Sequence, residues 1–193
     1  MNKLTLDDIK DQRAYERERS EFRARIIAMK KRRRIALGDL LTITFENTDT
    51  MRFQVQEMAR VERMLTDEQI QHEIDTYNEL IPGPRELSAT LFIEIDDKAG
   101  LYEWLPKLVG IQRAVSFWLP DGSAVRGEPL NEDLLTREET TSTVHYLRFG
   151  FTPEQVGAFG EPGTRVVVDH EHYDAVVELD DEQRSELLRD LVG

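Results

Sequence analysis

Residues 143–160, which read TVHYLRFGFTPEQVGAFG, decide the fold. Apolar side chains occupy alternate positions of the first half up to Phe151, and this alternation predicts a half-buried β-strand. The next residues, Thr152–Gln155, form a capping box with proline at the first helical position. We therefore expect the strand to be followed directly by a short helix that ends at Gly160.

Similar patterns recur along the rest of the chain. Turn residues separate pairs of apolar runs in residues 111–126 and 165–179, which predicts two hairpins. Strands and helices alternate without the regular βαβ order of parallel sheets, so the predicted fold is α+β, with a mainly antiparallel sheet and packed helices. The predicted strands are 40–45, 88–95, 111–119, 124–126, 143–151, 165–168 and 175–179, and the predicted helices are 6–35, 51–65, 67–81, 99–108, 153–160 and 181–191.

The N-terminal region is the most basic part of the chain. A capping box begins at Thr5, and no glycine or proline follows for more than thirty residues, so we expect one long helix over 6–35. Its apolar side chains form a narrow stripe, through which a homodimer is expected to form. The stripe consists of Tyr15, Phe22, Ile26 and Met29. We divide the chain into this basic N-terminal helix, 1–36, and one compact acidic α+β domain, 37–193, which the helix either clasps or leaves.

Charge is segregated along the chain. Residues 1–35 carry 12 of the 25 lysines and arginines but only 6 of the 38 acidic residues, a net of +6, and the remainder carries −19. The basic run is therefore the candidate site for a partner or an anion. It consists of Lys30, Lys31, Arg32, Arg33 and Arg34. Alternatively, the run caps the helix C-terminus and pairs with the acidic domain. Nucleic acid is the weaker choice of partner, because an acidic body repels it.

Several classes of function are excluded by residues that the chain lacks. It has no cysteine, which excludes disulfides, thiolate catalysis and iron–sulfur ligation. The common phosphate-binding, dinucleotide, serine-hydrolase and zinc-protease motifs are absent, so we expect neither catalysis nor a resident cofactor. No apolar run approaches the ~18 residues of a membrane span, and residues 1–8 show no apolar h-region, so we expect no secretory signal and a cytoplasmic location.

The histidines offer a candidate site for a divalent metal. In an extended segment the side chains of His170 and His172 project to the same face, as two ligands of one ion would. His145 is a third candidate, although its phase with Leu147 equally predicts a hydrogen-bonded core histidine. The alternative for the pair is the polar tip of the hairpin 165–179.

Carboxylates on two successive predicted helices offer a candidate acid–base pair. These residues are Glu57, Glu62, Glu73 and Asp75. Helices this acidic usually display their carboxylates to solvent, and this is the reading we favour.

Four stretches of the chain together resemble the bacterial family of domain of unknown function 3501 (DUF3501). They are FQVQEM at 53–58, YNELIP at 77–82, SATLFIE at 88–94 and the segment 169–173. The likeness spans almost the whole chain, with departures at Glu79 and Glu171, where relatives tend to have proline. The resemblance implies no activity. It does imply a genomic neighbourhood, because the genes of relatives often lie beside those of a rubrerythrin-like di-iron protein and an iron–sulfur oxidoreductase.

Three functional hypotheses follow. The first is a non-catalytic accessory protein that binds a rubrerythrin-like or iron–sulfur partner in an iron-dependent redox or peroxide-defence system. Charge segregation and the missing motifs motivate it, and the resemblance supplies the partner. The second is a metal-binding protein or metalloenzyme that uses His170 and His172. The third is nucleic-acid binding through the basic N-terminal helix.

Overall fold

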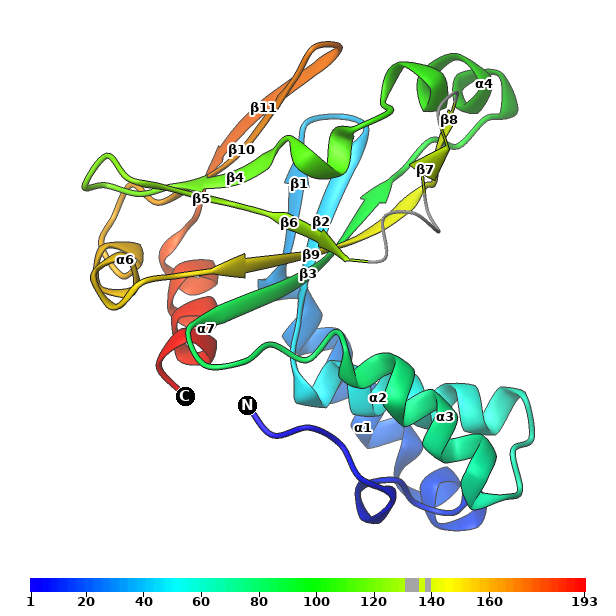
Figure 1. Cartoon of the computed structure of the whole chain (residues 1–193). Helices are drawn as coiled ribbons and strands as arrows, with labels where there is room; N and C mark the ends of the chain where they lie inside the picture. The colour runs from blue at the N-terminus through cyan, green and yellow to red at the C-terminus, as the bar shows by residue number, and fades with distance from the viewer. Residues whose placement is uncertain (131–135, 138–139) are drawn as a thin grey trace.

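The computed structural model describes residues 1–130, 136–137 and 140–193, and in these residues it shows two antiparallel sheets with helices around them (Figure 1). This confirms the α+β fold. The larger sheet contains, in spatial order, β1 (Arg34–Leu37), β2 (Leu41–Glu46), β3 (Glu86–Ile93), β9 (Val144–Gly150) and β6 (Glu128–Leu130). The smaller sheet contains β11 (Tyr173–Glu178), β10 (Arg165–His170), β4 (Val115–Trp118) and β5 (Ala124–Arg126). A short ribbon pairs β7 (Thr136–Arg137) with β8 (Thr140–Thr141).

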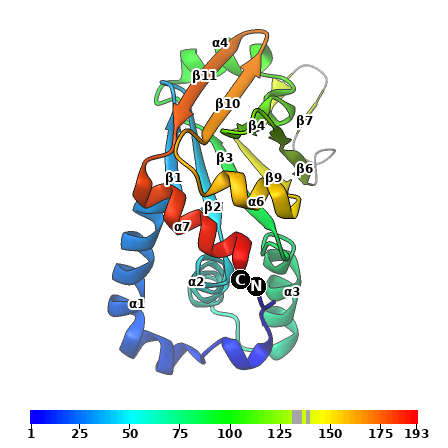
Figure 2. The same cartoon turned by 90° about the vertical axis from the view of Figure 1, so that its left-hand side faces the viewer.

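The helices form two groups. They are α1 (Gln12–Arg33), α2 (Thr48–Val61), α3 (Asp67–Asn78), α4 (Lys98–Lys107), α6 (Pro153–Phe159) and α7 (Asp181–Val192), with single 3₁₀ turns η1 (Leu6–Asp8) and η2 (Ile111–Arg113). Helices α1, α2 and α3 pack together at one end of the molecule, and α7 packs against α1, α6 and β3 (Figure 2). The C-terminal helix therefore links the N-terminal helix to the larger sheet.

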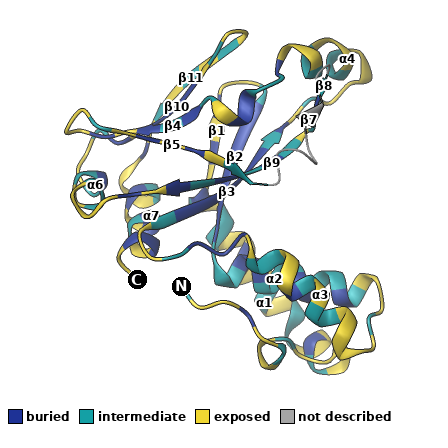
Figure 3. Ribbon diagram, viewed as in Figure 1, coloured by how far each residue is buried: buried dark blue, intermediate teal, exposed yellow. Residues whose placement is uncertain are grey.

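The two sheets share one core, which is rich in aromatic side chains. Phe117 of β4 lies 5.6 Å from Phe45 of β2 and 5.0 Å from Phe149 of β9, measured between ring centroids. All three side chains are fully buried. Burial is accordingly concentrated along the strands, whereas the helices keep exposed faces (Figure 3). A second, smaller cluster joins α2 and α3 to the N-terminal segment.

The first helix is long, as predicted, but the predicted limits of 6–35 were wrong at both ends. The capping box at Thr5 begins only the turn η1, and a second cap, in which the Asp11 side chain accepts from the Ala14 backbone, starts α1. At the other end Arg34 has extended dihedral angles and begins β1. The burial of alternate side chains explains why the helix ends here. Ile35 and Leu37 are buried beside β2, whereas Arg34 and Ala36 are exposed, which suits a strand. The predicted division of the chain after residue 36 falls inside this strand.

The narrow apolar stripe of α1 packs against the protein's own chain. Tyr15 and Ile26 are almost completely buried. Phe22 packs edge-on against Phe53 of α2, with 5.6 Å between ring centroids. The helix thus clasps the body, and Tyr15 and Phe22 of the stripe contact Glu57 and Phe53 of α2.

A fully buried arginine fastens the C-terminal end of α1. The Arg33 guanidinium donates to the backbone oxygens of Phe45 (2.9 Å) and Glu46 (3.3 Å) at the end of β2. It also donates to Glu186 (3.3 Å) and Asp190, both on α7. One side chain with no exposed surface therefore ties together a helix from each end of the chain and a strand of the larger sheet.

The environment of Arg33 sets the protonation of its two acidic partners in opposite directions. Burial raises the pKa of Asp190 above its ordinary value, and Arg33 offsets part of this rise. Burial also opposes ionisation of Glu186, but Arg32 and Arg33 together hold the pKa of that carboxyl below its ordinary value. Such a group is costly to disrupt, because removing one member leaves a buried charge without compensation.

Replacing Arg33 with methionine tests this arrangement. We expect Arg33→Met to lower the free energy of unfolding by about 3 kcal/mol or more, because Asp190 then lies buried without this cation and Glu186 loses one of its paired cations. Urea denaturation of the full chain measures the change.

The matched control is Arg34→Met, since the half-exposed Arg34–Glu94 pair should contribute less than about 1 kcal/mol. Adding Glu186→Gln and Asp190→Asn to Arg33→Met should restore part of the loss. Equal destabilisation by Arg33→Met and Arg34→Met would show that the buried group contributes no more to the free energy of unfolding than a half-exposed ion pair does.

Candidate binding site on the four-stranded sheet

The basic run Lys30–Arg34 is largely paired with carboxylates of its own chain. Four of its five side chains form ion pairs, and Lys31 is exposed. The pairs are Lys30–Glu46, Arg32–Glu182, Arg32–Glu186, Arg33–Glu186, Arg33–Asp190 and Arg34–Glu94. Their partners lie on β2, on α7 and at the residue that follows β3. This arrangement matches the alternative in which the run pairs with the acidic domain.

The FQVQEM stretch fastens the N-terminal segment onto α2. The Gln56 amide accepts from the Lys10 backbone nitrogen (3.0 Å) and donates to the Lys10 backbone oxygen (2.8 Å). Next to it, the Glu57 carboxylate accepts two hydrogen bonds of 2.8 Å from the Arg19 guanidinium and one of 2.7 Å from the Tyr15 hydroxyl. In this chain, Gln56 and Glu57 of FQVQEM, the most specific motif of the resemblance, therefore make structural contacts.

These contacts also decide the protonation of Glu57. Hydrogen bonding by Arg19 lowers the pKa of Glu57 to about 2, against the opposing effect of burial, with Tyr15 assisting. Burial and the bond to Glu57 raise the pKa of Tyr15. A carboxylate that is this acidic and already holds three hydrogen bonds is a poor general base at neutral pH. The candidate acid–base role of Glu57 is therefore not favoured.

Two of the three candidate metal ligands, His170 and His145, are hydrogen-bonded through their rings to neighbouring groups. His170 Nε2 lies 3.0 Å from the Val109 backbone oxygen, so this nitrogen carries the proton, and His170 Nδ1 accepts from the His172 backbone nitrogen (3.3 Å). His145 is buried, and its Nε2 lies 3.0 Å from the Ser142 backbone oxygen. The rings of His170 and His172 are 6.1 Å apart. Within the described ranges, no three histidine or acidic side chains gather as ligands of one ion.

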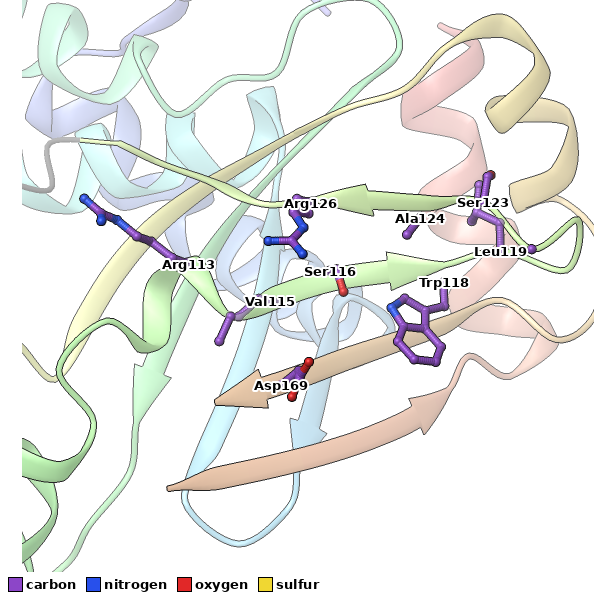
Figure 4. Close-up of a pocket in the computed structure, with 11 residues that line it drawn as sticks. Arg113, Val115, Ser116, Trp118, Leu119, Ser123, Ala124, Arg126 and Asp169 are labelled. Carbon is purple, nitrogen blue, oxygen red and sulfur yellow. The ribbon is translucent and has the colours of Figure 1, made fainter. Parts of the chain in front are cut away.

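A hollow of about 440 Å³ lies on the outer face of the four-stranded sheet (Figure 4). We call it the outer hollow. Its volume falls in the range of small-ligand and side-chain binding sites. The side chains that matter most for recognition are Arg113, Ser116, Trp118, Leu119, Arg126 and Asp169. They come from η2, β4, β5 and β10 and from the turn after β4, so segments far apart in the sequence build one site.

Strand alternation and register place these side chains on one face. Phe117 points into the core, so Ser116 and Trp118 on either side of it point outward. Arg126 pairs with Ser116 across β4 and β5 and shares its face. β10 pairs with β4 on the other side, which brings Asp169 to the opposite edge of the hollow.

The outer hollow combines an exposed indole with a cation that lacks a partner. Trp118 remains 50% exposed although it lies in a strand. The Arg126 guanidinium is exposed and forms no ion pair or hydrogen bond with any residue that the structure describes. By contrast, Arg165 on the same face pairs with Glu178 at 3.3 Å. Aromatic rings and free guanidinium groups are the side chains most enriched at the energetic centres of protein interfaces.

Analysis of the sequence missed this site, although a signal was present. In residues 115–119, VSFWL, the apolar side chains Val115, Phe117 and Leu119 set the inward phase, and Trp118 falls on the outward phase. A tryptophan on the polar face of a predicted strand is a large apolar side chain directed at solvent, and this is the signal that points to the hollow. What the sequence could not supply is the pairing of this strand with β10.

The family model described as "Protein of unknown function (DUF3501)" matches residues 3–191. The chain belongs to this family. The resemblance inferred from the four motifs is thereby confirmed.

A solved relative has the same fold. The chain is similar to a novel protein of unknown function from Burkholderia pseudomallei K96243, whose crystal structure is 33% identical in sequence and superposes with a TM-score of 0.90. The match covers 98% of this chain and 100% of that chain. A comparison with the curated proteins finds no match. Among the described residues no helix is long and apolar enough to cross a membrane.

The acidity of Glu57 predicts a pH dependence of stability. Because its pKa falls from an ordinary 4.5 to about 2 on folding, Glu57 stabilises the fold above pH 4.5, and this contribution is lost as the pH falls toward 2. Over that window we expect wild type to lose about 2 kcal/mol more unfolding free energy than Glu57→Gln. Urea titrations at several pH values measure this, with exposed Glu62→Gln as the control that should follow wild type. Parallel curves for wild type and Glu57→Gln would contradict the assignment.

The hydrogen bonds of His170 predict weak metal binding at the hairpin tip. A zinc ion could reach a ring nitrogen of His170 only after the bond to Val109 or the bond to the His172 backbone is broken. We therefore expect zinc titrated into chelator-treated protein to show no stoichiometric site that His170→Ala removes. Isothermal titration calorimetry measures it, with exposed His72→Ala as the control. A 1:1 site lost in His170→Ala and kept in His72→Ala would favour the metal hypothesis instead.

Proposed function

We propose that this protein is a non-catalytic accessory protein that binds a partner protein through the outer face of its four-stranded sheet. The observation that carries the proposal is the outer hollow, which is lined both by half-exposed Trp118 and by Arg126, a cation without an ion pair among the described residues.

The exposed apolar surface of this face supports the proposal. Val176 on β11 is 61% exposed, and Trp118 on β4 is 50% exposed, on the same face of one sheet. Isolated apolar side chains are normal on a protein surface, but an indole and a branched aliphatic side chain beside a pocket are typical of a docking surface. The sheet also provides a rigid platform, because its other face is packed against the aromatic core.

The chemistry of the remaining candidates also supports a binding role. Glu57 is held by Arg19 and Tyr15, and His145 and His170 donate to backbone oxygens. These side chains, which sequence analysis singled out for catalysis or metal binding, serve structural contacts. The basic run is likewise largely engaged with carboxylates of its own chain, so most of it is not available to bind a polyanion.

The finer part of the proposal concerns the partner. We propose a rubrerythrin-like di-iron or iron–sulfur protein of a cytoplasmic redox or peroxide-defence system, and its support is the neighbourhood that the family resemblance implies. A cysteine-free chain cannot hold an iron–sulfur cluster itself, so it would act on the partner rather than replace it.

Affinity capture at low salt tests the proposal. The full chain should retain a di-iron or iron–sulfur protein from its own cell extract, identified by mass spectrometry. Trp118→Ala should reduce the recovery at least about tenfold, because an interface tryptophan commonly contributes 2 kcal/mol or more.

Tyr102→Ala is the matched control, since Tyr102 is a 73% exposed aromatic residue on α4, outside the hollow. Recovery of no such partner, or equal recovery with Trp118→Ala and wild type, would overturn the proposal.

A further inference from the structure

We propose that the outer hollow binds an acidic segment of the partner protein, in which an aspartate or glutamate lies next to an aromatic or large aliphatic side chain. This inference rests on the proposed function and adds the chemistry that the partner must present. It depends on the charge, the shape and the hydrogen-bonding groups of the hollow.

Charge favours an acidic group at one end of the hollow. Arg113 and Arg126 line it, against the single carboxylate of Asp169. Arg113 has an interaction of its own, so what the hollow offers an acidic group is the cation of Arg126, on a chain whose net charge is −13. An acidic segment would be repelled by most of this surface and attracted here, which gives a specific position as well as affinity.

Arg126 is available to receive the acidic group. Its guanidinium has no ion pair within the part of the chain that the structure describes, whereas Arg165 on the same face is already paired with Glu178. Ser116, its cross-strand neighbour, adds a hydroxyl donor on the same face. A carboxylate above β4 and β5 can therefore take charge-assisted bonds from Arg126 and one from Ser116.

The other end of the hollow suits an apolar side chain. Trp118 and Leu119 line this end, and the indole is half exposed. Covering it with a ring or a branched aliphatic group would remove apolar surface from water and give an aromatic contact.

Asp169 limits the ligand to modest negative charge. Its carboxylate lies at the opposite edge of the hollow from Arg126 and accepts hydrogen bonds, so it suits the backbone N–H groups of a peptide. A polyphosphate or a nucleic-acid strand would bring several charges against this carboxylate. The Arg126 guanidinium at one edge and the Asp169 carboxylate at the other therefore favour a peptide over a polyanion.

A matched series of peptides tests the inference with the intact protein. The chain has two tryptophans, so Trp104→Phe leaves Trp118 as the sole indole, and its fluorescence reports events at the hollow. The probes are acetyl-Asp-Phe-Asp-amide and its counterparts with Asn or Lys in place of both Asp residues. We expect the Asp peptide to bind at least about tenfold more tightly than the Asn peptide, and the Lys peptide to bind most weakly. Raising the salt from about 50 to about 500 mM should weaken the Asp peptide alone.

Arginine variants in the same background locate the effect. Arg126→Gln should bind the Asp and Asn peptides equally, whereas Arg23→Gln, which alters an exposed arginine of α1, should keep the preference. Equal binding of the three peptides, no fluorescence change up to about 10 mM peptide, or a preference that survives Arg126→Gln would overturn the inference.

These results are separable from those of the capture experiment. A partner captured through Trp118, together with no preference for the Asp peptide, would leave the proposed function standing and refute the acidic segment. An Asp preference that depends on Arg126, with no di-iron or iron–sulfur partner captured, would refute the partner and keep the chemistry of the hollow.

Discussion

The buried guanidinium of Arg33 is the constraint on which the rest of the structure depends. Its hydrogen bonds reach two backbone oxygens at the end of β2 and two carboxylates on α7, so these elements must be in place before the charge is compensated. Burying the Arg33 cation before these partners are in place would cost free energy. Folding of the two chain ends is therefore coupled. The position of β2 in turn fixes the larger sheet and the aromatic core that supports β4.

This constraint changes the meaning of the charge asymmetry. A basic N-terminal region on an acidic body suggests a free cationic arm, but the structure directs most of the run Lys30–Arg34 at carboxylates of the same chain. Arg19, nearer the start of α1, is paired in the same way with Glu57 of α2. Outside the basic region, Arg126 on the smaller sheet is exposed and has no ion pair with any residue that the structure describes.

Local patterns predicted most of the secondary structure, because caps and alternation act within a few residues. The capping boxes at Thr66, Thr152 and Asp180 start helices as expected. The end of α1 was misjudged, since Arg34 continues a basic run that suits a helix while its pairing with β2 favours a strand. The outer hollow was not foreseen for a similar reason. Trp118 and Asp169 are about fifty residues apart, and only the antiparallel register of β4 and β10 brings them to one face.

A single measurement tests the different states of Arg33 and Arg126. Phenylglyoxal modifies accessible guanidinium groups, and mass spectrometry of the digested native protein gives a rate for each arginine. We expect rapid modification of Arg126, which is exposed and has no ion pair among the described residues, and almost none of Arg33, which is fully buried. Modification of Arg33 in the native protein at a rate close to that of Arg126 would contradict this expectation, because the cation taken to hold the fold together would then be free in solution.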